Sequence, residues 1–115
     1  MTALEVLTRV DARLHNVFTW EEKLYWLNGL EQLVYALLGR CGVEAQPDQL
    51  KPETVLSIPE PYSRAYDYWL EAQIHYGCQE YLKYNNAMQL FQSLWQEYAN
   101  SLRRSHPAEG RRSFF

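Results

Sequence analysis

The sequence predicts an all-α fold, a small bundle of about four helices. Two capping-box patterns, Thr2-x-x-Glu5 and Thr19-x-x-Glu22, place side chains where helix N-termini leave backbone N–H groups unpaired. The C-terminal half carries apolar residues at alternating steps of three and four, the spacing of a heptad seam. Five glycines and five prolines among 115 residues are too few for the many turns of a β-sandwich.

The two capping boxes open a short helix over residues 3–14 and a longer one over residues 20–40. Gly39 and Gly42 mark the end of the longer helix. The apolar face of this helix is too wide for a helix with a single neighbour. The predicted apolar stripes are Leu4, Leu7, Val10 and Leu14 on the first helix, and Leu24, Leu27, Val34 and Leu38 on the second, flanked by Trp26, Leu30, Leu33 and Leu37.

Residues 43–61 form the next segment, and they contain four of the five prolines. We expect a long Pro-containing loop here, with a short helical turn around 47–51 and with the loop held outside the core. A connection of this length without secondary structure is uncommon in a small domain and is usually functional or mobile.

Residues 61–103 are expected to form an αα-hairpin, with Pro61 in the first helical turn and a turn near 77–80. A single helix kinked at Gly77 is the structural alternative. The second arm carries a heptad seam of Tyr81, Tyr84, Met88, Phe91, Trp95, Tyr98 and Leu102. Residues 1–103 therefore make one domain, and 104–115 an extended, disordered basic tail.

The charge is divided unevenly between the body and the tail. Residues 1–102 hold seven basic and thirteen acidic side chains, a net charge of −6, which makes the body a poor match for a phosphate backbone. Residues 103–115 carry a net charge of +3. This tail is a candidate assembly segment that could contact an acidic surface. The simpler alternative is that its arginines are only solvated. Its arginines are Arg103, Arg104, Arg111 and Arg112.

Motifs for catalysis, cofactors or metals are absent from the sequence. There is no phosphate-binding loop, no nucleophile elbow and no histidine pair at metal-ligand spacing. Cys41 and Cys78 are expected to be free thiols. Glu71 and His75 share a helix face with Asp67 and form a conceivable general-base cluster, but a solvated polar face is the preferred interpretation. No enzyme activity, cofactor or metal is expected. No apolar run approaches the roughly 18 residues of a membrane span, so no membrane association is expected either.

Aromatic residues make up 15% of the chain, which is more than four short helices are expected to enclose. Tyrosine and tryptophan are enriched at protein–protein contacts, because one end of the side chain is apolar and the other forms hydrogen bonds. We therefore expect some of these rings to lie in subunit interfaces; a monomer with ordinary surface aromatics is the alternative. The candidate interface residues are Trp20, Tyr25, Tyr35, Tyr62, Tyr66, Tyr68, Trp69, Tyr84 and Trp95.

Three stretches resemble the head–tail connector (adaptor) proteins of tailed bacteriophages and prophages. The first runs from Val10-Asp11 to Trp26-Leu27. The second begins at Leu56-Ser57-Ile58-Pro59-Glu60-Pro61-Tyr62 and runs into Tyr66-x-Tyr68-Trp69-Leu70-Glu71-Ala72-Gln73-Ile74. The third begins at Glu80-Tyr81-x-x-Tyr84-Asn85-Asn86-x-Met88 and reaches His106-Pro107. Gly77 and the turn at Asn16-Val17-Phe18, which lacks a proline, depart from the family pattern, and the Arg-rich end with Phe114-Phe115 is not explained by it.

The resemblance implies a structural virion protein located at the head–tail interface and present in the bacterial host cytoplasm during assembly. Its subunits would form a ring, expected to be a dodecamer, below the portal, so that the DNA channel continues toward the tail. The implied partners are the portal protein and a tail-side connector or stopper protein, and DNA would pass without sequence-specific binding. The alternative function is a monomeric, TPR-like protein-binding module, although the chain shows no 34-residue repeat.

Overall fold

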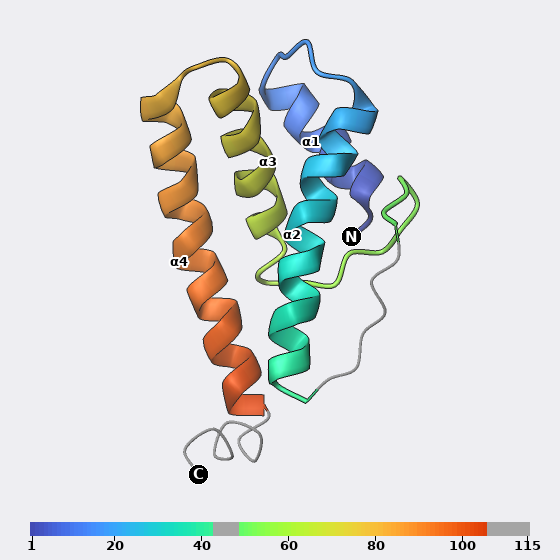
Figure 1. Ribbon diagram of the computed structural model, residues 1–115, viewed down its shortest axis with the longest axis vertical. Coiled ribbons are helices and arrows are strands. Elements are labelled where there is room, and N and C mark those ends of the chain that lie inside the picture. Colours follow the sequence, from blue (N-terminus) through green and yellow to red (C-terminus); the bar gives the residue numbers. More distant parts are fainter. Residues whose placement is uncertain (43–48, 106–115) are drawn as a thin grey trace.

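The computed structural model describes residues 1–42 and 49–105 and confirms the all-α prediction (Figure 1). The four helices are α1 (Ala3–Arg13), α2 (Trp20–Arg40), α3 (Arg64–Gly77) and α4 (Tyr81–Ser105). The sequence predicts that the extended tail starts at residue 104, but Arg104 and Ser105 belong to α4. The remaining residues of the tail, 106–115, lie outside the described part.

Both predicted capping patterns start helices. The Thr2 hydroxyl accepts a hydrogen bond from the Glu5 backbone N–H at 3.2 Å, and the Glu5 carboxylate accepts one from the Thr2 N–H at 3.3 Å. The Thr19 hydroxyl accepts from the Glu22 N–H at 3.1 Å. At the other end of α2, Gly42 has a φ of 80°, the left-handed conformation that favours glycine.

The predicted stripe of α1 is partly wrong. The buried residues are Ala3, Val6, Leu7 and Val10, whereas Leu4 is 39% exposed and Leu14 is only half-buried. The start of α1 is fixed by the chain that follows α2, because the Ala3 N–H donates to the Thr54 carbonyl at 3.0 Å. This contact sets a helix rotation that the apolar spacing alone did not predict.

The segment at 49–63 corrects the expectation of a loop held outside the core. Leu50, Leu56 and Ile58 are at most 6% exposed and belong to the main apolar cluster. The sequence predicts a short helical turn around 47–51, but residues 49–51 are not helical, so the prediction is wrong for them. Residues 43–48 lie outside the described residues. The Leu56 N–H also donates to the Met1 carbonyl at 2.9 Å, which ties this segment to the N-terminus.

The αα-hairpin is confirmed, and the single kinked helix is wrong. α3 ends at Gly77, and the chain reverses through Gln79, whose φ is 60°, before α4 begins. α3 starts at Arg64 rather than at 61, because residues 59–62 form a separate turn in which the Tyr62 N–H donates to the Pro59 carbonyl at 2.9 Å.

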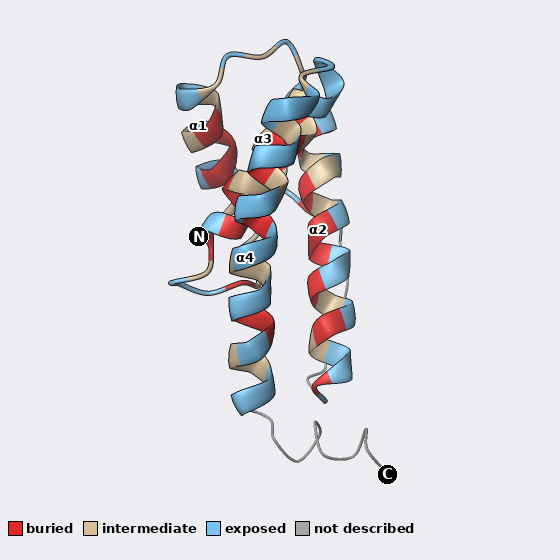
Figure 2. Cartoon of the chain, turned by 90° about the vertical axis from the view of Figure 1, so that its left-hand side faces the viewer, coloured by how far each residue is buried: buried red, intermediate tan, exposed pale blue. Residues whose placement is uncertain are grey.

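The heptad seam of α4 lies against the rest of the bundle for most of its length (Figure 2). Phe91 and Tyr98 are buried, and the flanking seam residues are half-buried. Tyr81, at the hairpin tip, is 53% exposed, so the seam is not covered at this end of α4. The core thus lies between α1, α2 and α3, and α4 covers one side of it.

Candidate assembly interface

The outward side of α2 carries no charged side chain between Glu22 and Arg40. The only two charged residues in that interval, Lys23 and Glu31, are buried, with 3% and 1% exposure. A helix that faces water normally shows the opposite arrangement. We call the exposed residues of this interval the outer α2 face. They are Tyr25, Gly29, Gln32, Leu33, Ala36 and Gly39.

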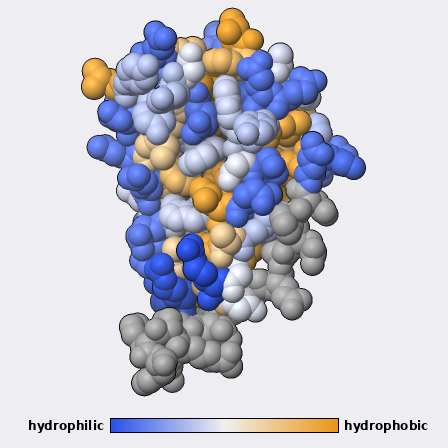
Figure 3. Space-filling view, in the orientation of Figure 1, coloured by the Kyte–Doolittle hydropathy of each residue, from blue (hydrophilic) through white to orange (hydrophobic). Residues whose placement is uncertain are grey.

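Large apolar side chains stand out on the outer α2 face. Tyr25 is 76% exposed and Leu33 is 47% exposed, and Trp20 at the start of the helix is 46% exposed. α2 crosses the front of the molecule in Figure 1, and Figure 3 shows apolar patches among the polar side chains of that front. Exposed apolar surface without neighbouring charge is typical of a protein–protein contact.

Lys23 fixes the rotation of α2 from within. Its ammonium donates to Asp11 Oδ1 at 2.7 Å and Oδ2 at 3.0 Å, and to Asn16 Oδ1 at 3.1 Å. Burial is the largest single influence on the pKa of Asp11, and it acts to raise that pKa. The hydrogen bonds from Lys23 and Asn16, together with the positive charge of Lys23, act in the opposite direction. The net result is a lowered pKa for Asp11.

Glu31 provides the second internal anchor of α2. Its carboxylate accepts hydrogen bonds from the Tyr66 hydroxyl on α3 and from the Ser57 hydroxyl, the latter at 2.9 Å. The Tyr66 oxygen in turn accepts from the Ile58 N–H at 2.8 Å. Burial, followed by the nearby Glu31 charge, raises the pKa of Tyr66 far above its usual value. With these two anchors, the uncharged face of α2 is held pointing outward.

The exposed side of α4 is also uncharged, from Lys83 as far as Glu97, and it is rich in amides. Amide and hydroxyl groups can form hydrogen bonds across a contact without burying a net charge. A shallow pocket of about 300 Å³, lined in part by Tyr84 and Met88, lies along this side. We call this surface the α4 amide face. Its polar residues are Asn85, Asn86, Gln89, Gln92, Ser93 and Gln96.

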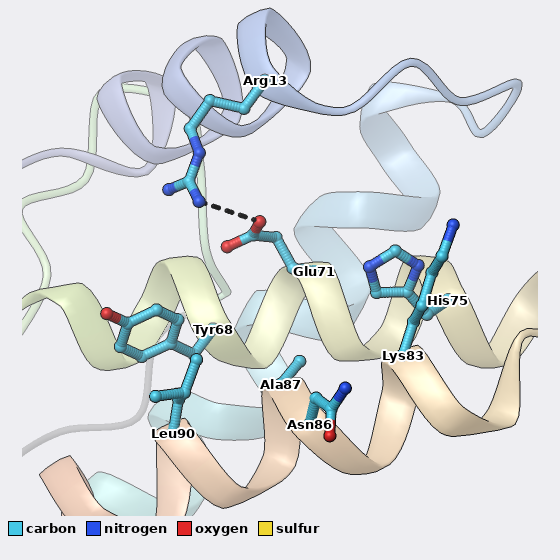
Figure 4. A pocket seen from close by; sticks show the side chains of 8 residues that line it. All are labelled: Arg13, Tyr68, Glu71, His75, Lys83, Asn86, Ala87 and Leu90. Carbon is cyan, nitrogen blue, oxygen red and sulfur yellow. Dashed lines mark ion pairs between the residues drawn. The ribbon is translucent and has the colours of Figure 1, made fainter.

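A second pocket, of about 220 Å³, lies between α1, α3 and α4 (Figure 4). Arg13 of α1 reaches toward Glu71 of α3, with 3.4 Å between Nη2 and Oε1. Burial raises the pKa of Glu71, and Arg13 opposes that rise. The complete lining is Arg13, Tyr68, Glu71, His75, Lys83, Asn86, Ala87 and Leu90.

The interpretation of Asp67, Glu71 and His75 as a solvated polar face is wrong. Asp67 is 0% exposed and forms a bidentate ion pair with Arg9, with both N···O distances 2.7 Å. The His75 side chain is only 12% exposed, with Nδ1 3.3 Å from Glu80 Oε1. The face is covered because α1 and α4 pack on both sides of α3. Since Asp67 is held by Arg9, the three residues do not form a base cluster either.

The structure places the nine predicted interface residues in three environments. Trp20 and Tyr25 are exposed, in agreement with a role at an interface. Tyr66 is 0% exposed, so its assignment to the surface is wrong; its ring lies in the core because its hydroxyl has partners there. The half-buried ones are Tyr35, Tyr62, Tyr68, Trp69, Tyr84 and Trp95.

Most of the half-buried rings are engaged within the chain. The Trp69 indole donates to the Trp26 carbonyl at 2.8 Å, and its ring lies 5.2 Å from that of Phe91. The Tyr62 ring lies 5.8 Å from that of Tyr98. Burial, then Glu31 and Cys41, raise the pKa of Tyr98 to about 12. These contacts hold the rings within the bundle.

Of the four predicted assembly-tail arginines, Arg103 and Arg104 lie exposed in the last turn of α4. Arg103 donates to the Asn100 side chain at 3.0 Å. Arg111 and Arg112 lie outside the described residues. The free thiols Cys41 and Cys78 are confirmed.

Sequence reasoning missed the internal charges and part of the exposed apolar surface. Leu33 was predicted to flank the core stripe of α2, yet it is 47% exposed. Val17 and Leu82, at 92% and 82% exposure, were not singled out. The signal that could have found the outer α2 face is the absence of charge between Lys23 and Arg40 apart from Glu31.

The acidic excess of the body is partly internal. Glu31 and Asp67 are buried, and Asp11 pairs with Lys23. At the exposed and half-buried positions within 1–42 and 49–102, nine carboxylates stand against six basic side chains. The outer surface of this part of the chain therefore keeps a moderate acidic excess.

Within the described ranges, no group of three or more His, Cys, Asp or Glu side chains could hold a metal ion. None of the described helices is long and apolar enough to cross a membrane. Comparison with protein-family models, curated proteins and solved structures finds no match to this chain.

Proposed function

We propose that this chain is a structural subunit of a phage head–tail connector, which assembles into a ring below the portal and continues the DNA channel toward the tail. The observation that carries the proposal is the outer α2 face, where Tyr25 and Leu33 are exposed while both charges between Glu22 and Arg40 are buried. The resemblance in three stretches of sequence gives the kind of assembly. The portal protein, a tail-side connector or stopper protein and a site in the virion follow from it as parts of the same proposal.

A ring requires two different contact faces on each subunit, because head-to-tail contacts close when each copy is rotated against the next. The chain offers such a pair in the outer α2 face and the α4 amide face. In Figure 2 α4 lies toward the viewer and α2 at the right-hand side, so the two helices occupy different sides of the bundle. The uncharged character of both faces allows them to meet without desolvating charges.

Passage of DNA is compatible with the surface charge. Phosphate contacts by lysine and arginine dominate nucleic-acid affinity, and strong binding would hold the DNA in the channel. The acidic excess at exposed and half-buried positions makes the body a poor match for a phosphate backbone.

The test is co-sedimentation with the portal protein encoded in the same genome. The wild-type chain is expected to sediment with portal rings in a fixed ratio. Leu33→Asp is expected to abolish this co-sedimentation, because it places a charge on the outer α2 face. Val17→Asp is the matched control: it places the same charge on a residue that is 92% exposed but lies outside this face, and it should sediment like the wild type.

Two results would contradict the proposal. One is a wild-type chain that stays monomeric and ignores the portal protein, which favours the TPR-like binding module. The other is a Leu33→Asp chain that assembles as well as the wild type, with both proteins folded by circular dichroism.

A further inference from the structure

The exposed residues of α2 and α4 follow the same heptad spacing. On both helices they recur at steps of four, three and four, which is the spacing of a coiled-coil seam. Two exposed seams with equal spacing can pack along each other, each side chain of one between side chains of the other. The two sets are Tyr25, Gly29, Gln32 and Ala36 on the outer α2 face, and Asn85, Gln89, Gln92 and Gln96 on the α4 amide face.

Side-chain size differs between the two seams in a complementary way. On α2, Gly29 and Ala36 leave space above the helix, and a Cβ atom added at Gly29 would meet nothing within 4 Å. On α4, Gln89 and Gln96 hold the corresponding positions with long side chains. When these positions face each other, a long side chain of one helix meets a short one of the other, as close packing requires.

The shallow pocket of about 300 Å³ on α4 offers a site for Tyr25 of another copy. The ring of Tyr25 is 76% exposed, and exposed aromatic rings are typical anchors in a partner's pocket. The pocket wall combines Tyr84, Met88 and three amides, so it supplies contacts for the ring and hydrogen-bond partners for the hydroxyl. Asn85 belongs to this wall, so the same alignment of the two seams brings Tyr25 to the pocket.

Lys83 selects the direction of the packing. It lies at the start of the α4 amide face and its side chain is 63% exposed. Parallel packing brings it to the start of α2, beside exposed Glu21 and Glu22, whereas antiparallel packing brings it beside exposed Arg40 at the end of α2. Charge complementarity of this kind fixes the orientation of a contact.

The other end of the α4 amide face favours neither direction. Glu97 and Arg103 both lie near that end, and their charges oppose each other. Lys83 is available to a partner, because its ion pair with Glu80, at 3.0 Å, is exposed and such pairs contribute little. The direction therefore depends on Lys83.

The course of the chain agrees with parallel packing. Within one chain α2 and α4 run in the same direction, both away from the end that carries the turn between α3 and α4 (Figure 1). Rotation about an axis along the helices keeps this direction in a neighbouring copy, whereas a two-fold axis across the helices reverses it. Parallel contact between α2 and α4 is thus the kind that a ring repeats.

We propose that the outer α2 face of one copy packs parallel to the α4 amide face of the next copy, with Gly29 opposite Gln89. In this register Tyr25 enters the pocket beside Asn85, and Ala36 lies opposite Gln96. The inference rests on the proposed function for the ring that repeats the contact, and it adds the orientation and the register of the two helices.

Disulfide cross-linking of the full-length chain tests the register. Every variant carries Cys78→Ser, which removes the exposed thiol and leaves only the buried Cys41. The chain is oxidised mildly, both alone at high concentration and with the portal protein. Gly29→Cys combined with Gln89→Cys is expected to give a ladder of linked chains, because a disulfide needs Cβ atoms roughly 4 Å apart.

The control pair is Ala36→Cys combined with Asn85→Cys. These two positions meet only when the two seams are antiparallel. In parallel packing they lie many residues apart along the helices, so the control pair should give roughly tenfold less linked product than the matched pair.

An exchange of side-chain size tests the same register without a covalent bond. Ala36→Gln is expected to weaken assembly roughly tenfold, because two long side chains then compete for one space. Adding Gln96→Ala should restore assembly, whereas adding Asn85→Ala should not. Ala12→Gln, which makes the same change at an exposed position of α1, is the matched control and should assemble like the wild type.

Two outcomes would overturn the inference while the wild-type chain still sediments with the portal. One is a ladder from the control pair in place of the matched pair, and the other is an Ala36→Gln chain that Gln96→Ala does not restore. Failure of the proposed function looks different: the matched pair links free chains and the size exchange behaves as expected, but no chain sediments with the portal. A wild-type chain that neither associates with itself nor sediments with the portal would contradict both.

Discussion

At the scale of single residues, the buried hydroxyl of Tyr66 connects three parts of the fold. It donates to Glu31 on α2 and accepts from the Ile58 N–H. Tyr66→Phe removes the hydroxyl and leaves a buried carboxylate oxygen and a buried N–H without this partner. We expect a loss of roughly 1–3 kcal/mol in the free energy of unfolding, measured by urea denaturation.

The control for this change is Tyr81→Phe, which removes a hydroxyl from a ring that is 53% exposed. Its effect should stay within about 0.5 kcal/mol. Equal effects of the two substitutions would show that the link between Tyr66 and Glu31 does not stabilise the fold.

The ion pair of Asp11 and Lys23 predicts how stability changes with pH. The pKa of Asp11 is lowered from its ordinary value of 3.8, so its contribution is present above that value and is lost as the pH falls through the lower folded-state pKa. The difference in unfolding free energy between the wild type and Asp11→Asn should therefore be constant between about pH 5 and 7 and shrink below about pH 4.

Glu71 acts in the opposite direction, because its pKa is raised, so its protonation on acidification favours the folded state. It is present in both proteins, and its effect cancels in the difference. Urea denaturation at a series of pH values measures the quantity directly. A difference that grows as the pH falls below 4 would contradict the account of Asp11.

Sequence patterns predicted apolar burial at single residues better than they predicted polar burial. Leu27 and Val34 were placed in the core from spacing alone, and both are 0% exposed. Glu31 and Asp67 are as deeply buried, but their partners lie 26 or more residues away in sequence. Helical periodicity carries no information on such distant pairs. A charged side chain such as Asp67 is therefore predicted to be solvated even when a distant partner buries it.

At the scale of helices, Gly77 controls how the hairpin packs on the connection between α1 and α2. A Cβ atom at this position would lie 2.6 Å from the end of the Phe18 ring, which itself packs edge-on against Trp26 with ring centroids 5.0 Å apart. Gly77→Ala is expected to destabilise the protein by roughly 1–3 kcal/mol, although alanine favours helices.

The matched control is Gly29→Ala, because a Cβ atom there meets nothing within 4 Å. It should stabilise the free chain by roughly 0.5–1 kcal/mol through helix propensity. Thermal unfolding of both variants measures the contrast. If Gly77→Ala also stabilises the chain, the contact with Phe18 is not a constraint on the hairpin.

The helices themselves were largely predictable, and the segment between them was not. Capping boxes, Pro61 and heptad spacing located four helices, with three of the starts within one residue and α3 displaced by three. The segment at 49–63 looked like an excluded loop because prolines dominate it. Its buried residues, such as Leu56 and Ile58, follow no periodic pattern, and their burial depends on contacts with the N-terminus and α3.

At the scale of the whole molecule, the aromatic excess of the sequence divides into two groups. The rings of Tyr66, Trp69 and Phe91 stabilise the bundle. Trp20 and Tyr25 remain on the surface next to a helix face without charges. The prediction of interface aromatics therefore stays a prediction for Trp20 and Tyr25 and is wrong for Tyr66, whose ring could not be distinguished from surface rings by spacing.

The same division applies to charge. The sequence predicted an acidic body. Part of the excess is internal, and nine exposed or half-buried carboxylates against six basic side chains remain within 1–42 and 49–102. We expect the full-length chain to bind duplex DNA only in the non-specific range, about 10⁻⁴ M or weaker at physiological salt. Fluorescence anisotropy with a labelled duplex measures this affinity. Submicromolar binding that survives Arg111→Ala/Arg112→Ala would contradict a DNA channel wall of this kind.

The central claim is that the outer α2 face joins copies of this chain into a ring on the portal. Native mass spectrometry of the portal protein mixed with the chain tests it most directly, because each bound copy adds 13.7 kDa. The account predicts one dominant complex that carries a full ring, a dodecamer by the family resemblance, and its loss in Leu33→Asp but not in Val17→Asp. A spectrum that shows the portal alone beside free 13.7 kDa chains would contradict it.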